Sequence, residues 1–460
     1  MSAIAVIDIG KTNAKLSCVE AHSGVLLSST STETQIKNGA LYPHIDTESM
    51  WHWYLSALKQ QQTLNDIQTI VVLAHGSTAA LVNENGLVLP VMDYEFDGPD
   101  VISEEYNALR DPFSETFSPP LPLALNLGRQ LFWQRRYFKA DYQRATHLLT
   151  YPQFWTWKLT GRMASEVSSI GAATDLWHPM ENRYSDFADR EGFSPLFPER
   201  RFAGDVLGSI TAELAQATGI RENCRVLVGI HDSNASLLPW LTSRDTPFTV
   251  MSTGTWVINF SVGASLEGLS AERDCLANVT IHSEPVACSR FMAGREYAAI
   301  AGSETVHPTV DDLLNIIDDD IFALPSFTDT GGPFPGMAGM VQTHRNLTAL
   351  DRHALASLYC ALVCDESLTV CNATGDIIVE GAFAKNSLFL QCLAVFRTEQ
   401  RLLASADSTG TTLGATLLAM PNINAPELMP AVETEPKLER KLIDYKAQWK
   451  KRMATGHQTL

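Results

Sequence analysis

The chain has 460 residues, of which 45% are hydrophobic and 19% charged, with a formal net charge of −18. This composition is typical of a globular protein with enough material for two or three hydrophobic cores. The acidic charge argues against generic binding to nucleic acid or to anionic membranes, because both are negatively charged. No apolar run approaches the ~18–20 residues of a membrane-spanning helix. The first residues lack the basic segment of a signal peptide, so we expect a cytoplasmic protein.

The first predicted elements are two strands, over residues 3–9 and 15–19, joined by the turn Asp-Ile-Gly-Lys-Thr-Asn at 8–13. The Gly-Lys-Thr triplet resembles the end of a Walker A loop. The glycine that this motif needs five positions earlier is replaced by Ala5, and a strand follows where the motif opens a helix. Two interpretations stay open: a strand–turn–strand phosphate site with hydroxyl, amide and ammonium donors, or a polar hairpin turn capped by Asp8 and Asn13.

Strands and helices alternate along the rest of the chain, which is the pattern of an α/β protein. The main predicted strands cover residues 69–74, 225–230, 249–252 and 376–380. The main predicted helices cover residues 49–61, 125–137, 349–373 and 387–398. Residues 112–122 are rich in turn-forming residues and are predicted to be a connection, and residues 329–340, rich in glycine and proline, a surface loop or lid. The eight cysteines lack the spacing of a zinc site, so we expect buried structural thiols.

The strand–turn–strand pattern of residues 3–19 occurs a second time, about half the chain later. There the sequence Met-Ser-Thr-Gly-Thr at 251–255 follows one strand and precedes another over 256–262. Two such hairpins predict two similar domains that face each other. We place the first domain at 1–242, the second at 243–425 and a charged helical tail at 426–460.

Two further segments place polar residues where a strand gives way to a helix. In Gly-Ile-His-Asp-Ser-Asn-Ala at 229–235, Asp232 is either a helix-capping carboxylate or a general base that takes a proton from a substrate hydroxyl. In the second segment, 379–386, Gly381 would permit close approach of a planar ligand. Asn386 would cap the following helix, hydrogen-bond a base edge, or both. The small residues of 408–415 predict a closely packed helix.

Seven segments, in this order, resemble the FGGY family of carbohydrate kinases, most closely its rhamnulokinase-like and related ketose-kinase branches: DIGKTN, LTYPQFWTWKLTG, GIHDSNAS, MSTGTW, FMAGREY, VEGAFAKN and TGTTLGATLLA. The resemblance runs over about residues 3–420. It implies an α/β fold of two actin-like (ribonuclease H-like) domains with ATP and sugar in a central cleft. It also implies a kinase that uses ATP and Mg²⁺ and binds a small-molecule sugar. We expect no nucleic-acid or membrane partner, and a monomer or homodimer.

The resemblance assigns roles to individual residues. Asp232 would be the catalytic base, and the sugar contacts would be His75, Gly76, Gln130, His231, Asp232 and Ser233. ATP would be held by residues from both hairpins and from the segments after them: Gly10, Lys11, Thr12, Asn13, Lys15, Thr253, Gly254, Thr255, Gly294, Gly381, Ala382, Lys385 and Asn386. Asp8 would lie near the magnesium ion, usually through water.

The chain departs from the family pattern in the first turn and in the predicted sugar region. Lys11 is a bulky cation where the first turn commonly has small or hydroxyl residues, and it either adds a phosphate contact or alters how the turn closes. His75 and Gly76 stand where a larger polar or aromatic residue is frequent. In Asp93-Tyr94-Glu95, the acidic residue that usually follows an aromatic is Glu95. These departures leave the sugar open: an L-rhamnulose- or L-fuculose-like deoxyketohexose, or a pentulose. The alternatives are an actin-like ATPase and a non-catalytic sugar- or nucleotide-binding relative.

Overall fold

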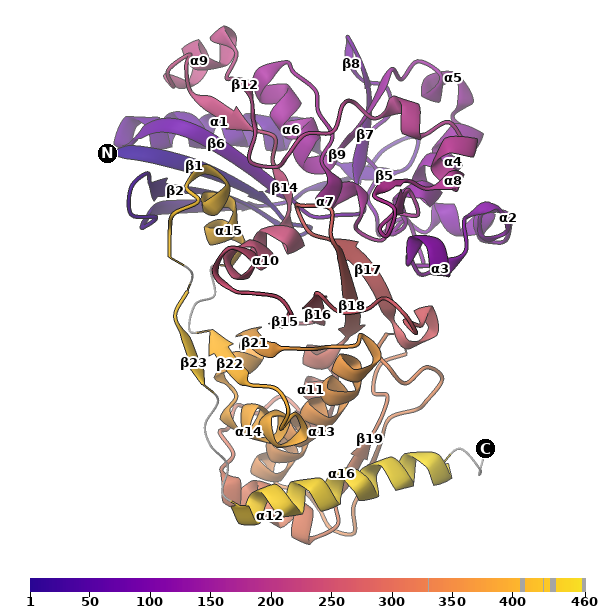
Figure 1. Ribbon diagram of the computed structural model, residues 1–460. Helices are drawn as coiled ribbons and strands as arrows, with labels where there is room; N and C mark the ends of the chain where they lie inside the picture. Colours follow the sequence, from indigo (N-terminus) through magenta and orange to yellow (C-terminus); the bar gives the residue numbers. More distant parts are fainter. Residues whose placement is uncertain (330, 406–409, 425, 431–435, 457–460) are drawn as a thin grey trace. The chain divides into compact units, whose positions relative to one another are not determined.

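The chain forms two compact units in a computed structural model that describes residues 1–329, 331–405, 410–424, 426–430 and 436–456. Unit 1 comprises residues 1–243, 277–285 and 409–425, and unit 2 comprises residues 244–276, 286–408 and 426–460. The first boundary lies close to the break expected near 242. Unlike the division expected from the sequence, the structure groups 277–285 and 409–425 with unit 1, and the tail with unit 2. Figure 1 shows that each unit contains its own sheet and its own helices.

The main sheet of unit 1 has seven strands in the order β12-β13-β6-β1-β2-β3, with β14 paired to β6. The β1–β2 hairpin is antiparallel, whereas β1, β6, β13 and β14 are parallel where they pair. The carboxyl ends of β1, β6 and β14 therefore meet at one edge. These strands are β1 (Ser2–Ile9), β2 (Asn13–Glu20), β3 (Leu26–Glu33), β6 (Asp66–Ala74), β12 (Val206–Ser209), β13 (Arg225–Leu227) and β14 (Ile230–His231).

Helices cover both faces of this sheet, because successive strand residues point to opposite sides. Ala5 and Ile7 of β1 belong to a core with helices α1 (Thr47–Leu64), α6 (Tyr151–Thr160) and α9 (Ala212–Thr218). Ile4 and Val6 belong to a second core with α10 (Asp232–Ser243) and α15 (Gly410–Ala419). A Cβ at Gly414 would lie 1.6 Å from the Ala235 carbonyl oxygen, so a glycine is required where α15 meets α10. This contact explains why α15 groups with unit 1.

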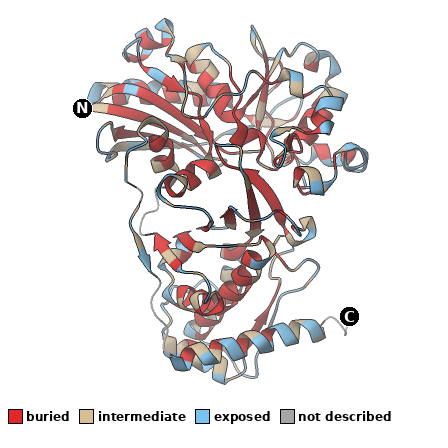
Figure 2. Ribbon diagram, in the orientation of Figure 1, coloured by how far each residue is buried: buried red, intermediate tan, exposed pale blue. Residues whose placement is uncertain are grey.

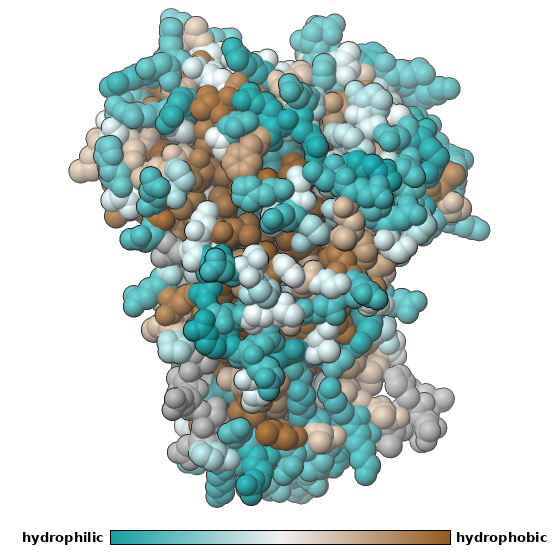
Figure 3. Space-filling model, viewed as in Figure 1, coloured by the Kyte–Doolittle hydropathy of each residue, from teal (hydrophilic) through white to brown (hydrophobic). Residues whose placement is uncertain are grey.

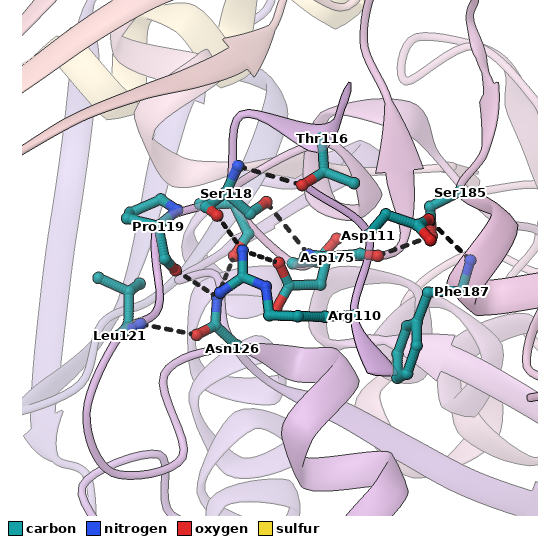
Figure 4. Close-up of polar contacts among 12 residues, drawn as sticks. Arg110, Asp111, Thr116, Ser118, Pro119, Leu121, Asn126, Asp175, Ser185 and Phe187 are labelled. Atoms are coloured by element: carbon teal, nitrogen blue, oxygen red, sulfur yellow. Dashed lines mark hydrogen bonds and ion pairs between the residues drawn. The ribbon is translucent and has the colours of Figure 1, made fainter. Parts of the chain in front are cut away.

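Between β6 and β12 the chain builds an additional region with its own core. Figure 4 shows the buried polar network that ties its loops together. Arg110 forms an ion pair with Asp175 at 2.7 Å, and the Asn126 amide donates to the carbonyls of Pro119 and Ala173. The elements are α2 (Ser103–Leu109), α3 (Phe113–Thr116), α4 (Leu127–Tyr137), α5 (Lys139–Tyr142), α7 (Val167–Ile170), α8 (Asp186–Arg190), η1 (Gly98–Ile102), η2 (Ser194–Leu196), and strands β4 (Ile36–Asn38), β5 (Pro43–Ile45), β7 (Ala79–Asn83), β8 (Gly86–Leu87), β9 (His147–Thr150), β10 (Trp177–His178) and β11 (Arg183–Tyr184), of which β4 and β5 precede β6.

The main sheet of unit 2 repeats the connectivity of unit 1, in the order β17-β18-β16-β15-β21-β22-β23. Again an antiparallel hairpin, β15–β16, lies beside two parallel strands, β21 and β22. The strands of this sheet are β15 (Phe248–Thr253), β16 (Val257–Val262), β17 (Cys275–Val279), β18 (Pro285–Phe291), β21 (Asp376–Gly381), β22 (Leu402–Ser405) and β23 (Leu428–Pro430). A separate two-stranded sheet consists of β19 (Phe322–Leu324) and β20 (Met340–Gln342). The helices are α11 (Ala293–Ala301), α12 (Val310–Asp318), α13 (Ala349–Val370), α14 (Ser387–Phe396), α16 (Pro436–Gly456), η3 (Ala271–Arg273) and η4 (Ala382–Lys385). Figure 2 shows the central strands β15, β16 and β21 and the helix α13 as largely buried.

Most predicted elements are confirmed, with differences where glycine or proline interrupts the pattern. The strand expected over 225–230 divides into β13 and β14 at Gly229, whose φ is 91°. The connection expected over 112–122 contains the short helix α3. The helix expected from 408 begins at Gly410 among the described residues, and Ser408 and Thr409 lie outside them.

The cysteines and the surface agree with the composition. All eight cysteines are buried and free. Within the described residues, no group of three or more histidine, cysteine or acidic side chains is arranged to hold a metal ion, and no helix is long and apolar enough to cross a membrane. Hydrophilic side chains are spread over the face shown in Figure 3.

Candidate active site

The β1–β2 turn presents exposed polar side chains at the edge of the unit 1 sheet. The Gly10 amide donates to the Asn13 carbonyl at 2.9 Å, and the Thr34 amide donates to the Thr12 carbonyl at 2.8 Å. These backbone bonds close the turn and leave the side chains of Thr12 and Asn13 exposed. The turn is thus a rigid hairpin with free hydroxyl and amide groups.

Asp8 lies at the end of β1, opposite Lys15 in the antiparallel register. Its Oδ2 is 3.4 Å from the Lys15 ammonium and accepts a hydrogen bond from the Thr411 hydroxyl at 3.1 Å. Thr411 belongs to α15 and was not predicted from the sequence. Its contact arises because α15 packs back onto unit 1.

Asp232 is the first residue of α10, directly after β14. Its Oδ1 accepts from the Ser233 amide at 2.6 Å and from the Ser233 hydroxyl at 3.3 Å, and His231 Nε2 lies 3.3 Å away. Although the side chain is 30% exposed, desolvation by the surrounding protein and the nearby Asp8 carboxylate raise the pKa of Asp232 to about 6. A carboxylate with this pKa accepts a proton more readily than an ordinary aspartate.

Buried side chains from other elements fix the backbone on either side of β14. The Gln153 amide donates to the carbonyls of Val228 and Gly229 at 3.1 and 3.2 Å. The Ser168 hydroxyl accepts from the His231 amide at 3.1 Å and donates to the Glu166 carboxylate. Burial raises the pKa of Glu166 to about 7. These supporting residues were not predicted, because only the folded chain brings 153–168 to β14.

His75, Gly76 and His231 lie close together beside Asp232. A Cβ at Gly76 would lie 2.8 Å from His231 Nε2, so any larger residue would displace this imidazole. Burial lowers the pKa of His231 to about 4 and also lowers the pKa of His75, so both rings are neutral near pH 7. Neutral imidazoles offer one donor and one acceptor each to a polar ligand.

Gln130 and Lys11 lie in settings that the sequence does not reveal. The Gln130 amide is buried and donates to the carbonyls of Ser77 and Ala124, which supports the loop after β6. The Lys11 ammonium forms an ion pair with Asp93 and lies 3.3 Å from Glu95. A direct sugar contact of Gln130 and a phosphate contact of Lys11 remain predictions.

The β15–β16 turn is the counterpart of this hairpin in unit 2. Gly254 and Thr255 are exposed, and the Gly294 amide at the start of α11 donates to the Thr255 carbonyl at 3.1 Å. A Cβ at Gly294 would lie 2.6 Å from the Gly254 carbonyl oxygen. Thr253 is instead buried, and its hydroxyl donates to the Glu380 carbonyl and accepts from the Phe383 amide. Thr253 therefore fixes the turn, whereas the Thr255 side chain is exposed.

The segment after β21 places four predicted residues beside the same turn. Gly381 has a φ of 83°, and a Cβ there would lie 2.0 Å from the Thr253 carbonyl oxygen, so only glycine fits. Ala382 and Lys385 are exposed. Asn386 caps α14: its side-chain oxygen accepts from the Phe389 amide at 3.0 Å, and its amide donates to the Ser357 hydroxyl at 2.9 Å.

A magnesium ion bound largely through water fits the donors near Asp8. Mg²⁺ in nucleotide enzymes keeps several waters and uses one or two carboxylates together with substrate phosphates, rather than a cage of protein ligands. The described residues offer this kind of site. The Asp8 carboxylate also acts on the Asp232 carboxylate electrostatically and raises its pKa.

Comparison with known proteins gives a consistent picture. Residues 245–427 match the carbohydrate kinase FGGY C-terminal domain. The chain is 24% identical over 245 residues to a proposed sugar kinase, YoaC, of Bacillus subtilis (strain 168), and the match spans about half of each protein, 50% of this chain and 48% of YoaC.

Solved structures cover almost the whole chain. A carbohydrate kinase from Novosphingobium aromaticivorans has 32% identity and a TM-score of 0.92 over 98% of both chains. A xylulose kinase and a gluconate kinase, both from Lactobacillus acidophilus, share the fold, each with 12% identity and a TM-score of 0.80; they cover 100% and 99% of this chain, which in turn covers 99% and 98% of theirs. The predicted architecture of two actin-like domains is thereby confirmed. The chain belongs to the FGGY family of carbohydrate kinases.

Proposed function

We propose that the chain is an ATP-dependent sugar kinase that transfers the γ-phosphate of ATP to a hydroxyl of a ketose. The preferred acceptors are an L-rhamnulose- or L-fuculose-like deoxyketohexose or a pentulose. Family membership supports the phosphotransferase class, and the choice of a ketose rests on the resemblance of the sequence segments. The observation that carries the proposal is Asp232: a carboxylate with its pKa raised to about 6, fixed at the end of β14.

In the proposed mechanism, Asp232 accepts the proton of the attacking sugar hydroxyl. Its Oδ1 is held by Ser233, so the orientation of the carboxylate is set before the substrate binds. The neutral imidazoles of His75 and His231 orient the sugar by hydrogen bonds. Gly76 leaves room for the His231 ring. Phosphoryl transfer needs mainly such positioning, together with charge neutralisation.

The triphosphate would be held by exposed donors of the two hairpins: Thr12, Asn13 and the backbone at Gly10 in unit 1, and Gly254 and Thr255 in unit 2. Lys15 contributes positive charge next to Asp8. Gly381, Ala382, Lys385 and Asn386 would line the adenosine, with Gly294 supporting the second turn. Asp8 would hold Mg²⁺ through water, and the ion would neutralise negative charge on the phosphates.

A coupled ADP-release assay tests this proposal. The panel contains L-rhamnulose, L-fuculose, D- and L-ribulose, D- and L-xylulose, tagatose and fructose. We expect ADP release to depend on at least one ketose. Asp232→Asn should lower kcat by a factor on the order of 10²–10⁴ while ATP still binds.

Asp245→Asn is a matched control, because Asp245 is an exposed aspartate outside the proposed site, and it should keep full activity. Full activity of Asp232→Asn would overturn the assignment of the base. ATP hydrolysis that no sugar stimulates would instead favour an actin-like ATPase. ATP binding without any turnover would favour a non-catalytic relative.

A further inference from the structure

Lys11 lies in the first hairpin turn, yet its side chain pairs with residues 82 or more positions later in the chain. Its ammonium is bonded to Asp93 and lies 3.3 Å from Glu95, and the ring centroid of Tyr94 is 4.8 Å away. The side chains of Lys11 and Asp93 are only 19% and 11% exposed. The backbone amide of Glu95 also donates to Asp93 at 3.0 Å, while the Glu95 side chain is 60% exposed. We call Lys11, Asp93, Tyr94 and Glu95 the Lys11 cluster.

The Lys11 cluster borders the residues assigned to the sugar. The Tyr94 ring meets the His75 ring edge-on, with centroids 5.3 Å apart. Burial raises the pKa of Tyr94, and the carboxylates of Glu95, Asp232 and Asp93 raise it further. Through the Tyr94 ring the ion pair therefore reaches His75.

His75 shows that this region has an unused hydrogen-bonding atom. The ring is 7% exposed, and its Nδ1 lies 2.9 Å from the Gly76 carbonyl, to which it can only donate. Nε2 is then an acceptor, and within the described part of the chain it has no hydrogen-bond partner. A buried acceptor without a partner is unfavourable. A ligand hydroxyl would satisfy it, whereas a carboxylate has no proton to donate.

The charges of the same region disfavour an anionic sugar. Among the described residues of this region, the carboxylates of Asp8, Asp93, Glu95 and Asp232 outnumber the ammonium groups of Lys11 and Lys15. Lys11 is already engaged by Asp93 and Glu95, and Lys15 by Asp8. A sugar acid would have to draw a lysine away from its carboxylate and leave that carboxylate unpaired. A neutral polyol can accept from the Lys11 ammonium and donate to the neighbouring carboxylates through the same hydroxyls.

We propose that the Lys11–Asp93 ion pair, together with Glu95, is a specificity-determining element that selects an uncharged ketose or polyol and rejects aldonic acids. This inference rests on the proposed kinase function with Asp232 as its base. It explains why a cation replaces the small residue expected after Gly10, because the Lys11 side chain pairs with Asp93 and Glu95 beside the proposed sugar contacts. Thr12 and Asn13 then remain as the side chains of the turn proposed to bind phosphate.

The test compares neutral and acidic sugars of matched carbon chain: D-xylulose with D-xylonate, L-rhamnulose with L-rhamnonate, and fructose with D-gluconate. kcat/KM is measured by ADP release. For the wild type we expect kcat/KM for each aldonate to be at least about 100-fold lower than for the best ketose, because an aldonate would leave polar groups of the site without partners. Lys11→Met should raise KM for the ketose about tenfold or more, with a smaller change in kcat.

The double variant Asp93→Asn/Glu95→Gln leaves Lys11 without its carboxylates. We expect the preference for ketose over aldonate to fall by about tenfold or more, because specificity is a difference of two affinities. Lys37→Met is the control: it breaks another lysine–aspartate pair of unit 1, Lys37–Asp46, and should leave the preference unchanged. ATP affinity, measured by calorimetry, verifies that each variant is folded.

The outcomes separate this inference from the proposed function. Equal or better turnover of an aldonate by the wild type would overturn the inference and leave the kinase function intact. So would an unchanged preference in the double variant. Absence of ADP release with every ketose and every aldonate would overturn the kinase function, and the inference with it.

Discussion

The chemistry assigned to Asp232 depends on the few groups around its carboxylate. Burial and the Asp8 carboxylate both disfavour its charged form, whereas the hydrogen bonds from Ser233 favour it, and the resulting pKa is about 6. The base is active only as the carboxylate. The protonated fraction therefore becomes important at a pH well above that of an ordinary aspartate, whose pKa is about 3.9.

The pH profile of kcat/KM should follow this ionisation. We expect kcat/KM to be constant from pH 7 to 8 and to fall below about pH 6, approaching a tenfold loss for each further pH unit. The pKa of His231 is about 4 and that of His75 is also lowered, so neither should add a second limb between pH 6 and 8. The measurement is kcat/KM for the best ketose at saturating ATP from pH 5 to 8.

The variant Asp8→Asn tests whether the Asp8 carboxylate contributes to the raised pKa of Asp232. It removes a charge that raises the pKa of Asp232, so the acidic limb of the residual activity should move to lower pH. A wild-type profile that stays flat down to pH 5 would contradict the raised pKa. A limb that moves to higher pH in Asp8→Asn would contradict its cause.

At the level of elements, the strand-to-helix junction β14–α10 is held by α6 and α7. Gln153 of α6 holds the carbonyls before β14, and Ser168 of α7 holds the His231 amide. The sequence segment Gly-Ile-His-Asp predicts the junction and its aspartate, because a strand pattern and a helix pattern meet there. It does not predict the supports, since their hydrogen bonds link residues more than sixty positions apart.

Ser168→Ala tests whether this support matters for catalysis. The change leaves the buried His231 amide without its acceptor and Glu166 without one donor, at a cost of about 1–3 kcal/mol. Because a shift of about 1 Å at a reacting group can cost on the order of 10²-fold in rate, we expect kcat to fall at least about tenfold with ATP affinity unchanged. Steady-state kinetics and calorimetry give the two quantities.

Neighbouring variants separate positioning from general damage to the core. Ser169 is buried beside Ser168, and its hydroxyl has no hydrogen-bond partner in the described part of the chain, so Ser169→Ala should keep kcat. Ser168→Thr retains a hydroxyl and should restore most of the lost rate. Equal values of kcat for Ser168→Ala and Ser169→Ala would show that Ser168 has no positioning role.

At the scale of the whole molecule, the chain contains the same sheet connectivity twice. β1, β2, β6 and β13 of unit 1 correspond in order and direction to β15, β16, β21 and β22 of unit 2. The repeated Gly/Thr turns predict this duplication, because the pattern of a strand and its turn is local. The return of α15 to unit 1 is not local. It depends on Gly414 meeting Ala235, and no pattern in the sequence indicates that partner.

The same distinction between local and long-range features applies to the candidate site. The sequence pattern predicts Asp232 and the exposed turn residues, since each lies at the end of a strand, and the family resemblance adds His75. The partners of Lys11 depend on the path of residues 88–95 after β8, which side-chain patterning alone does not determine. Thr253 was predicted as a ligand contact, and its burial follows from pairing with β21, where its hydroxyl bridges Glu380 and Phe383.

The duplication suggests that ligand binding is divided between the units, with the sugar residues in unit 1 and the adenosine residues in unit 2. Gly381→Ala tests this division. The new Cβ would lie 2.0 Å from the Thr253 carbonyl oxygen, so the end of β21 and the β15–β16 turn would have to move. We expect ATP affinity to fall about tenfold or more, while the ketose still raises the melting temperature of the variant as it does for wild type.

Gly268→Ala is the matched control for this substitution. Gly268 also belongs to unit 2 and has a φ of 78°, close to the 83° of Gly381, but its added Cβ would meet nothing within 4 Å. Both variants therefore place an alanine at a positive φ, and only Gly381→Ala also forces the new Cβ against the Thr253 carbonyl oxygen in the proposed adenosine site. Calorimetry with ATP and thermal unfolding with the ketose measure the two ligands separately. Equal ATP affinity in the two variants would place the nucleotide elsewhere, and loss of both responses in Gly381→Ala alone would show that the two sites are not separable.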